Sequence, residues 1–261
     1  MPGVVRSSRM QKGPTAPIVD AVEFIPRDLL KDRVRHEGKA SYEVIQIADR
    51  VFGSDRPGWP AHSIPKRMFD VIVALFALFV LLPGLLTIAL AIKLSSPGPI
   101  LFRQRRYGLN NEVFTIYKFR TMYADKCDDT GVTQTRMGDQ RVTHIGKLLR
   151  RCDLDELPQL LNVVRGDMSL VSPRPHVPGM LAAGVPYEIL VPNYFERHRV
   201  RPGLTGLAQA LGFRGSTEGA DTAKIRIELD LKYIQSWSFA LDLRLIVETA
   251  WKEFLKAGNG I

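Results

Sequence analysis

Cysteine is scarce in this sequence. Among 261 residues there are 2 cysteines, Cys127 and Cys152, and no C-x-x-C pair. They form neither a disulfide framework nor a cysteine-rich zinc site, so a reducing compartment is expected. An apolar stretch is also missing from the first 17 residues, which are polar and contain several prolines. We therefore expect no secretory signal peptide.

Motifs of several common enzyme classes are absent. The 5 histidines show neither H-E-x-x-H nor another metal-ligand spacing. There is no P-loop, no G-x-G-x-x-G dinucleotide fingerprint and no G-x-S-x-G nucleophile elbow. His176 and His198 are better read as structural or exposed histidines than as general bases. Any acid–base or nucleophilic chemistry is expected from carboxylates.

Negative charge is in the minority. The chain has 27 Asp and Glu against 36 Lys and Arg, which gives a formal net charge of +9 and a pI of about 9.7. This excess indicates a polyanionic partner: nucleic acid, anionic lipid or a phosphorylated metabolite. A nucleic-acid binder would need a contiguous basic groove with stacking aromatic residues. The membrane segment described next argues against nucleic acid.

One long run has no charge at all. Residues 71–92, VIVALFALFVLLPGLLTIALAI, would reach roughly 33 Å as a helix at about 1.5 Å per residue, close to the bilayer hydrocarbon thickness. Pro83 lies at its middle, where proline bends a helix. Basic residues flank both ends: Lys66, Arg67, Lys93, Arg103, Arg105 and Arg106. Because basic flanks favour the cytoplasmic side, we predict a re-entrant helix that bends at Pro83.

The predicted organisation has three parts: a polar N-terminal extension at 1–65, the re-entrant membrane helix at 66–95, and a compact cytoplasmic domain at 96–261. Two runs rich in aromatic and β-branched residues flank residues 109–112 and predict a small β-hairpin. Apolar periodicity predicts helices at 28–35, 41–52, 144–151, 155–164, 224–236 and 241–256. The predicted fold class is α+β, mainly helical, in a monotopic membrane protein.

An adjacent acid pair, Asp155 and Glu156, stands before Pro158. Proline is tolerated in the first helical turn, which makes Asp155 the expected N-cap and sets the pair at a helix mouth. Taken alone, the pair is better explained as a helix cap, since acids there stabilise the helix dipole by about 0.3–1 kcal/mol.

The basic residues around the pair favour a second interpretation. Strand alternation puts Lys118 and Arg120 on one face and Phe119 on the other. Four arginines lie in short segments near proline or glycine: Arg150, Arg174, Arg199 and Arg201. A carboxylate that attacks a diphosphate must overcome charge repulsion, which requires cations and favours Mg²⁺. We therefore predict that these six residues bind phosphate.

Six ordered blocks carry a family resemblance: KRMFD (66–70), SSPGPILFRQRRYG (95–108), KFRTM (118–122), DQRVTHIGKLLRR (139–151), LDELPQLLNVVRGDMSLVSPRP (154–175) and RHRVRPGLTGLAQ (197–209). The succession resembles the bacterial sugar transferases. These are monotopic polyprenyl-phosphate phosphoglycosyl transferases that begin exopolysaccharide, O-antigen and glycoprotein glycan assembly. The chain looks like the family's short form.

The resemblance implies a mechanism. Asp155 would attack the β-phosphate of a UDP-sugar, UMP would leave, and polyprenyl (undecaprenyl) phosphate would take the phosphosugar from the aspartyl intermediate. Glu156 matches the family's Mg²⁺-binding acid, and Arg150 and Arg174 match its phosphate-binding arginines. Pro83 matches the break in its membrane helix.

The resemblance also implies a location and partners. The catalytic domain would lie on the cytoplasmic face of the bacterial inner membrane, in contact with membrane lipids and upstream of other glycosyltransferases. The alternative is a catalytically inactive, membrane-anchored scaffold of the same pathway, which would release no UMP from any UDP-sugar. The sequence departs from the family pattern at Asp153, Ser172 and Leu207, and it does not identify the sugar.

Overall fold

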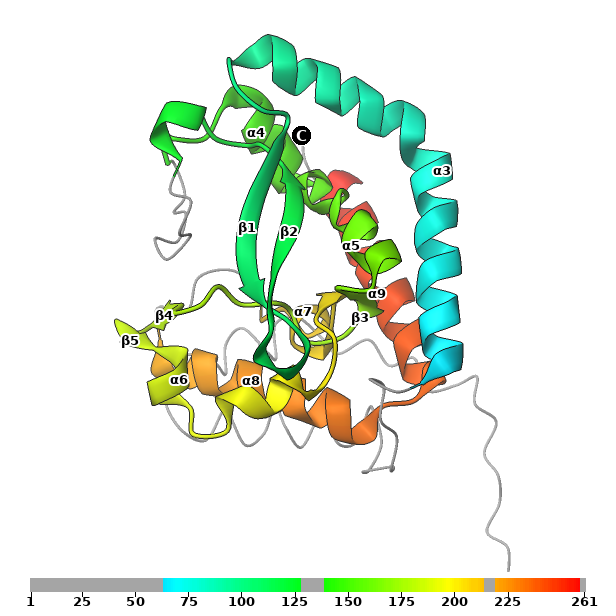
Figure 1. Cartoon of the computed structure of the whole chain (residues 1–261), viewed down its shortest axis with the longest axis vertical. Helices are drawn as coiled ribbons and strands as arrows, with labels where there is room; N and C mark the ends of the chain where they lie inside the picture. Colours follow the sequence, from blue (N-terminus) through cyan, green and yellow to red (C-terminus); the bar gives the residue numbers. More distant parts are fainter. Residues whose placement is uncertain (1–62, 128–138, 214–218, 259–261) are drawn as a thin grey trace, which may run out of the picture.

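The computed structural model describes residues 63–127, 139–213 and 219–258. These residues are mainly helical and contain three two-stranded sheets, as the α+β prediction requires. A long bent helix frames one side of the molecule, a β-hairpin lies in its concave side, and two helices pack near its first arm (Figure 1). The helices predicted at 28–35 and 41–52 lie outside the described residues.

The uncharged run forms the middle of helix α3 (Ile64–Ser95). This helix is long and apolar enough to cross a membrane, and only 6% of its most apolar 18-residue stretch is buried in the protein. It continues through Pro83, and Thr87 Oγ1 donates to the Pro83 carbonyl at 2.9 Å. A missing proline N–H and a threonine bond of this kind both bend helices. Figure 1 shows two arms at an angle, while their return to one membrane face stays a prediction.

The predicted hairpin is confirmed. Strands β1 (Leu101–Tyr107) and β2 (Val113–Phe119) pair antiparallel, and Leu101 lies opposite Phe119 at the end next to α3. The far end closes through the 3₁₀ turn η2 (Leu109–Asn111), where Asn110 and Asn111 have φ values of 52° and 65°. Asparagine adopts this left-handed region more readily than most residues. After β2 comes a second 3₁₀ turn, η3 (Ala124–Lys126).

The acid pair lies between two short helices, α4 (His144–Arg151) and α5 (Gln159–Arg165). The prediction for α4 is confirmed, whereas the helix predicted at 155–164 is wrong at its start. Asp155 belongs to a separate 3₁₀ turn, η4 (Leu154–Glu156), and α5 begins after Pro158. Asp153 provides the reason: its φ of 50° reverses the chain after α4, a left-handed conformation that aspartate tolerates better than most residues.

A parallel pair of short strands follows α5. Strand β3 (Ser169–Val171) pairs with β6 (Gly203–Thr205). The chain between them contains β4 (Leu181–Ala182), β5 (Val185–Pro186), α6 (Tyr187–Leu190) and the 3₁₀ turn η5 (Tyr194–Arg199). Helix α7 (Leu207–Ala210) follows β6. A side chain at Gly203 would collide with the backbone of Ser172, so the close approach of these segments requires glycine there.

The last two helices complete the main core. Helices α8 (Ala220–Ser236) and α9 (Phe239–Gly258) confirm the predictions at 224–236 and 241–256, with earlier starts. Their inward positions join residues of α5, β3 and α7 in one apolar cluster that includes Val163, Val171, Leu207, Leu229 and Leu245. Ala74 of α3 is fully buried in the same cluster. The first arm of α3 is thereby held to the domain.

Buried charges fix the start of α3, and we call Lys66, Asp70 and Asp242 the anchor cluster. Lys66 Nζ lies 2.6 Å from Asp242 Oδ2 of α9 and donates to the Val171 carbonyl at 3.0 Å. Asp70 accepts hydrogen bonds from Ser169 Oγ at 2.7 Å and from the backbone N–H of residue 170 at 3.2 Å. Asp70 is therefore buried against protein.

Candidate active site

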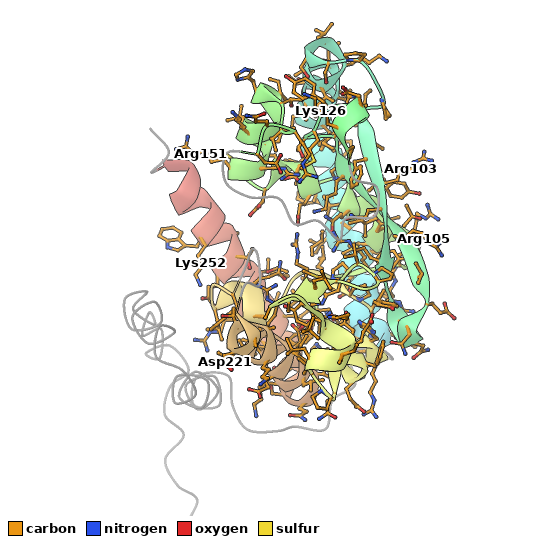
Figure 2. All side chains as sticks on the ribbon, turned by 90° about the vertical axis from the view of Figure 1, so that its left-hand side faces the viewer. Arg103, Arg105, Lys126, Arg151, Asp221 and Lys252 are labelled. Carbon is orange, nitrogen blue, oxygen red and sulfur yellow. The ribbon has the colours of Figure 1, made fainter. Side chains whose placement is uncertain are left out.

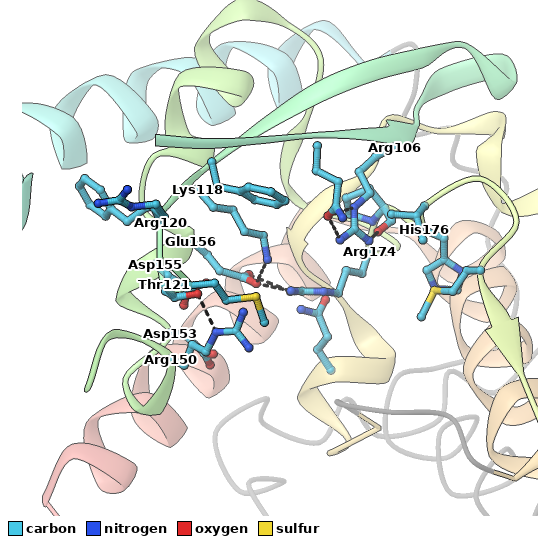
Figure 3. Close-up of a pocket in the computed structure, with 18 of the residues that line it drawn as sticks. Arg106, Lys118, Arg120, Thr121, Arg150, Asp153, Asp155, Glu156, Arg174 and His176 are labelled. Carbon is cyan, nitrogen blue, oxygen red and sulfur yellow. Dashed lines mark hydrogen bonds and ion pairs between the residues drawn. The ribbon is translucent and has the colours of Figure 1, made fainter. Parts of the chain in front are cut away.

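A cavity of about 410 Å³ contains the acid pair. Its walls come from the hairpin, from α4 and η4, from the loop after β3, and from α8. Eight lysine or arginine side chains and four carboxylates line it, so its lining has a positive charge excess. Figure 3 shows Lys118 and Arg174 both reaching Glu156, with Asp155, Asp153 and Arg150 grouped beside them.

Glu156 is held by two cations from distant parts of the chain. Lys118 Nζ of β2 lies 2.7 Å from Glu156 Oε1, and Arg174 grips both carboxylate oxygens, with Nη1 at 2.9 Å from Oε2. Burial by itself would raise the pKa of Glu156, but Arg174 and Lys118 outweigh it and hold that pKa well below its usual range. Glu156 is therefore a permanent anion that orients Lys118 and Arg174.

Asp155 behaves differently from its neighbour. Its residue is only 8% exposed, and burial raises the pKa of its carboxyl above the ordinary value. Lys118 opposes this increase, whereas the negative charges of Glu156 and Asp153 add to it. A desolvated carboxylate of raised pKa is a better nucleophile than a solvated one. The two adjacent acids thus have different environments: Glu156 is an ion-paired anion, and Asp155 is a buried carboxyl whose pKa is raised.

Two further arginines are held in place beside the acids. Arg150 Nε of α4 donates to Thr121 Oγ1 at 2.8 Å, which aims it into the cavity (Figure 3). Arg106 of β1 donates through Nε to Gln104 at 3.0 Å and through Nη1 to the Pro175 carbonyl at 3.1 Å. Burial, followed by repulsion from Arg174, lowers the pKa of Arg106 to about 10, so it stays charged at neutral pH.

The loop that carries Arg174 is fixed from behind by a buried ion pair. Arg197 of η5, only 1% exposed, donates through Nε to Asp230 of α8 at 2.9 Å. Its Nη2 donates to the backbone carbonyl of Arg174 at 2.6 Å. Because the same guanidinium contacts both α8 and the loop, the position of Arg174 depends on the packing of the C-terminal helices.

Three of the predicted phosphate-binding residues have other partners. Arg120 borders the cavity, but its guanidinium donates to the Ser96 carbonyl at 2.7 Å and to the Pro97 carbonyl, at the C-terminus of α3. The last carbonyls of a helix lack internal donors, which explains this bond. Arg199 pairs with Glu196 at 2.8 Å on the surface, and Arg201 donates to the Gly166 carbonyl at 3.0 Å.

Arg199 and Arg201 do not line the cavity that holds the acids. Substrate contact by these two residues and by Arg120 stays a prediction from sequence. Of the six predicted phosphate-binding residues, those that line the cavity with Asp155 and Glu156 are Lys118, Arg120, Arg150 and Arg174.

Sequence reasoning missed several residues that line the cavity: Gln104, Arg106, Arg141, Arg197, Arg226 and Asp230. Strand alternation could have found the first two, because Gln104 and Arg106 share the hairpin face of Lys118. A second signal was a charged pair four residues apart, Arg226 and Asp230, at buried positions of an otherwise apolar helix face. Arg141 carries no such local signal.

The donor set bears on a metal ion. Among the described residues, no group of three or more His, Cys, Asp or Glu side chains is arranged to hold a metal. Mg²⁺ nevertheless binds commonly through one or two carboxylates and the phosphates of a substrate. Asp155 and Glu156 supply two carboxylates in one cavity with cations for a diphosphate. The residues therefore fit a Mg²⁺ ion that is bound together with a substrate diphosphate.

The fold and the site agree with one family. The bacterial sugar transferase family matches residues 61–256, which is most of the chain. The chain belongs to this family, and the matched region contains α3, the hairpin and every residue of the cavity.

Three related proteins are similar to this chain over about three quarters of its length. The chain is 52% identical over 195 residues, 75% of its length and 97% of the relative's, to an exopolysaccharide production protein, PSS, of Rhizobium leguminosarum bv. phaseoli. It is 49% identical over 198 residues, 74% of its length and 73% of the relative's, to a UDP-glucose:undecaprenyl-phosphate glucose-1-phosphate transferase of Caulobacter vibrioides. It is 40% identical over 207 residues to an N-acetylgalactosamine phosphotransferase of Aeromonas hydrophila, covering 79% of this chain and 47% of that one.

Proposed function

We propose that this protein transfers a phosphosugar from a UDP-sugar to polyprenyl phosphate, the first membrane step of exopolysaccharide or related glycan assembly. The observation that carries the proposal is the environment of the acid pair: a buried, desolvated Asp155 next to Glu156, within a cavity lined mainly by cations. The names of the relatives support the same reaction class, since one acts with UDP-glucose and another with UDP-N-acetylgalactosamine on undecaprenyl phosphate.

In the first step, a carboxylate oxygen of Asp155 attacks the β-phosphorus of the UDP-sugar. The bond between that phosphorus and the oxygen bridging to the α-phosphate breaks, and UMP leaves with that oxygen and its electron pair. The phosphosugar remains on Asp155 as an acyl phosphate. Lys118, Arg150 and Arg174 stabilise the charge that builds on the phosphoryl oxygens, since preorganised donors in a desolvated site act most strongly there.

In the second step, a phosphate oxygen of polyprenyl phosphate attacks the same phosphorus. The bond to Asp155 breaks, which restores the carboxylate and produces polyprenyl-diphosphate-sugar. Both steps need an ionised acceptor or nucleophile close to other anions. The cavity meets this need because its cations outnumber its carboxylates.

We include Mg²⁺ in the proposal as the cofactor, held by Glu156 with Asp155 beside it. Such an ion would neutralise diphosphate charge and polarise the phosphoryl oxygen. Glu156 also has a structural role, because its two oxygens orient Lys118 and Arg174. Loss of Glu156 is therefore expected to disturb the phosphate-binding cations with or without the metal.

The proposed location is the cytoplasmic face of the bacterial inner membrane. The exposed, apolar α3 supports membrane association, and the basic hairpin residues Arg103 and Arg105 support contact with anionic headgroups. Membrane lipids are the immediate partners, and glycosyltransferases that extend the lipid-linked sugar are the expected consumers of the product.

UMP release tests the proposal. Protein in nanodiscs with undecaprenyl phosphate and Mg²⁺ is incubated with a panel of UDP-sugars, and UMP is quantified for wild type and Asp155→Asn. We expect wild type to release UMP with at least one sugar and Asp155→Asn to be slower by roughly 10³-fold or more, since a carboxamide is not a nucleophile here. Wild-type rates in Asp155→Asn would rule out Asp155 as the nucleophile. Absence of UMP with every sugar would favour an inactive scaffold.

A further inference from the structure

A second cavity of about 1250 Å³ lies on the other face of the hairpin. We call the cavity that contains the acid pair the catalytic cavity, after the proposed function. The alternation of β1 separates the two spaces: Arg106 lines only the catalytic cavity, whereas Leu101, Arg103 and Arg105 line only the second one. Thr115 of β2, paired with Arg105, belongs to the second cavity as well. The hairpin is therefore a wall between two spaces.

The second cavity is mainly apolar and reaches the membrane helix. Its walls include Leu85, Leu86 and Ala89 of the second arm of α3. Opposite them lie Leu101 and Phe102 of β1, Phe119 of β2, and Pro158 and Leu161 at the start of α5. We call this space the membrane-side groove. An aliphatic ligand would bury its surface there without displacing any hydrogen-bonded group of these side chains.

The membrane-side groove adjoins the catalytic cavity. Five residues line both spaces: Phe102, Gln104, Phe119, Arg120 and Cys127. They mark the end of the hairpin next to α3, where Leu101 pairs with Phe119. Asp155 lies in the catalytic cavity, and Pro158, three positions later, lies in the groove. The groove therefore ends beside the cavity that holds Asp155, the proposed nucleophile.

Positive charge at the rim of the groove favours a ligand with an anionic group. Arg103 and Arg105 are exposed and project from the hairpin, as Figure 2 shows. An apolar groove with cations at its rim and a cationic cavity at its inner end suits a ligand with a long hydrocarbon chain and one anionic end.

We propose that the membrane-side groove binds the isoprenoid chain of the polyprenyl phosphate acceptor, next to its phosphate. The phosphate then enters the catalytic cavity at the end marked by Phe102 and Phe119. This inference rests on the proposed function, and it commits to the acceptor rather than to a bilayer phospholipid because the groove adjoins the cavity that holds Asp155.

Two half-reactions separate this inference from the proposed function. In Ala89→Trp the new side chain fills the groove, while Leu90→Trp is the matched control, since Leu90 is 60% exposed on the same helix and lines neither space. A UMP burst without acceptor measures the first half-reaction. Transfer to undecaprenyl phosphate and to a ten-carbon prenyl phosphate measures the second.

We expect Ala89→Trp to keep the UMP burst and to lose transfer to undecaprenyl phosphate by about tenfold or more, because excluding two or more buried CH₂ groups has that effect. Transfer to the ten-carbon acceptor should fall much less. Leu161→Trp, which fills the groove from α5, should reproduce this pattern and guards against misfolding of one variant. Wild-type transfer to undecaprenyl phosphate in both variants, or equal losses with both acceptors, would overturn the inference.

A binding test does not depend on turnover. In Cys152→Ser protein in nanodiscs, Cys127 is the remaining thiol, and maleimide labelling reports on the junction of the two spaces. Undecaprenyl phosphate should slow the labelling of Cys127 by about threefold or more, as expected when most sites are occupied, and phosphatidylglycerol should not. Equal protection by phosphatidylglycerol would assign the groove to ordinary lipid and overturn the inference. Protection without any UMP release would leave the groove standing and refute the proposed function.

Discussion

The anchor cluster and the catalytic cavity both bury charged side chains, but only the anchor cluster gives every charged oxygen a hydrogen-bond donor. In the anchor cluster each charged oxygen has a donor: Tyr233 donates to Asp242 Oδ1 at 2.8 Å, and Trp237 donates to Asp242 Oδ2 at 3.1 Å. Lys66 lies between the two carboxylates. The cluster is closed, so it stabilises one arrangement of α3 against α9 and leaves no charge for a ligand.

The catalytic cavity keeps an excess of cations around open space. Glu156 satisfies Lys118 and Arg174, but Arg106 and Arg150 add positive charge that the acids do not balance one for one. Burial of such an excess costs free energy unless a polyanion completes it. Closure, rather than burial, therefore distinguishes the charges of the anchor cluster from those of the proposed active site.

The largest expected effect comes from opening the closed cluster. Lys66→Met leaves Asp242 and Asp70 buried without their cation, which should lower the free energy of unfolding by about 3–5 kcal/mol. Denaturant unfolding in detergent measures it. Lys93→Met, an exposed lysine of the same helix, is the control. The double variant Lys66→Met/Asp242→Leu should recover part of the loss, and no recovery would mean that packing rather than charge holds the cluster.

A large loss of activity, without loss of stability, is expected in the open site. Arg174→Lys removes the two-pronged grip on Glu156 and one set of phosphate donors, so UMP release should fall by roughly 10²-fold. Arg151→Lys, an exposed arginine of α4, should retain activity. Equal unfolding curves for Arg174→Lys and wild type would confirm that the cost falls on function. A stability loss as large as that of Lys66→Met would erase the distinction between the two regions.

A smaller effect concerns pH. In the proposed mechanism Asp155 attacks when ionised. Its raised pKa therefore predicts that activity is lost as pH falls through that value, above the ordinary 3.8 of an aspartate. Asp153 contributes a negative charge that favours the protonated form, so Asp153→Asn should shift the acid limb of the rate profile to lower pH. Asparagine tolerates the left-handed backbone there. A pH–rate profile of UMP release, with Asp221→Asn as control, measures it, and a shift to higher pH would contradict the assignment.

The smallest effect tests a residue that sequence reasoning favoured and the cavity omits. Arg199 pairs with Glu196 on the surface, so Arg199→Ala should change UMP release by less than twofold and stability by about 0.5 kcal/mol or less. Steady-state rates at several UDP-sugar concentrations decide the matter. A rise in KM of tenfold or more would restore the prediction that Arg199 binds substrate.

Local sequence patterns predicted most of the helices and strands, but they did not predict which side chains contact one another. The hairpin at 109–112 and the helix at 144–151 follow from short-range alternation and periodicity, and the structure confirms both. The prediction of a helix at 155–164 was wrong at its first residues because Asp153 adopts a left-handed backbone conformation. A single aspartate in the sequence is not enough to predict that conformation. Arg120 borders the cavity, but its guanidinium is held by the carbonyls of Ser96 and Pro97 at the end of α3, which the local sequence pattern did not predict.

The sequence by itself determined the apolar α3, the hairpin and the acid pair, because these depend on hydrophobicity and spacing within one segment. Only the tertiary structure decided which cations meet those acids, because Lys118, Arg150 and Arg174 come from separate elements whose packing brings them together. The same packing buries Asp155 and so separates its pKa from that of Glu156. Desolvation depends on the packing of the whole cavity, so it cannot be predicted from the identity of neighbouring residues in the sequence.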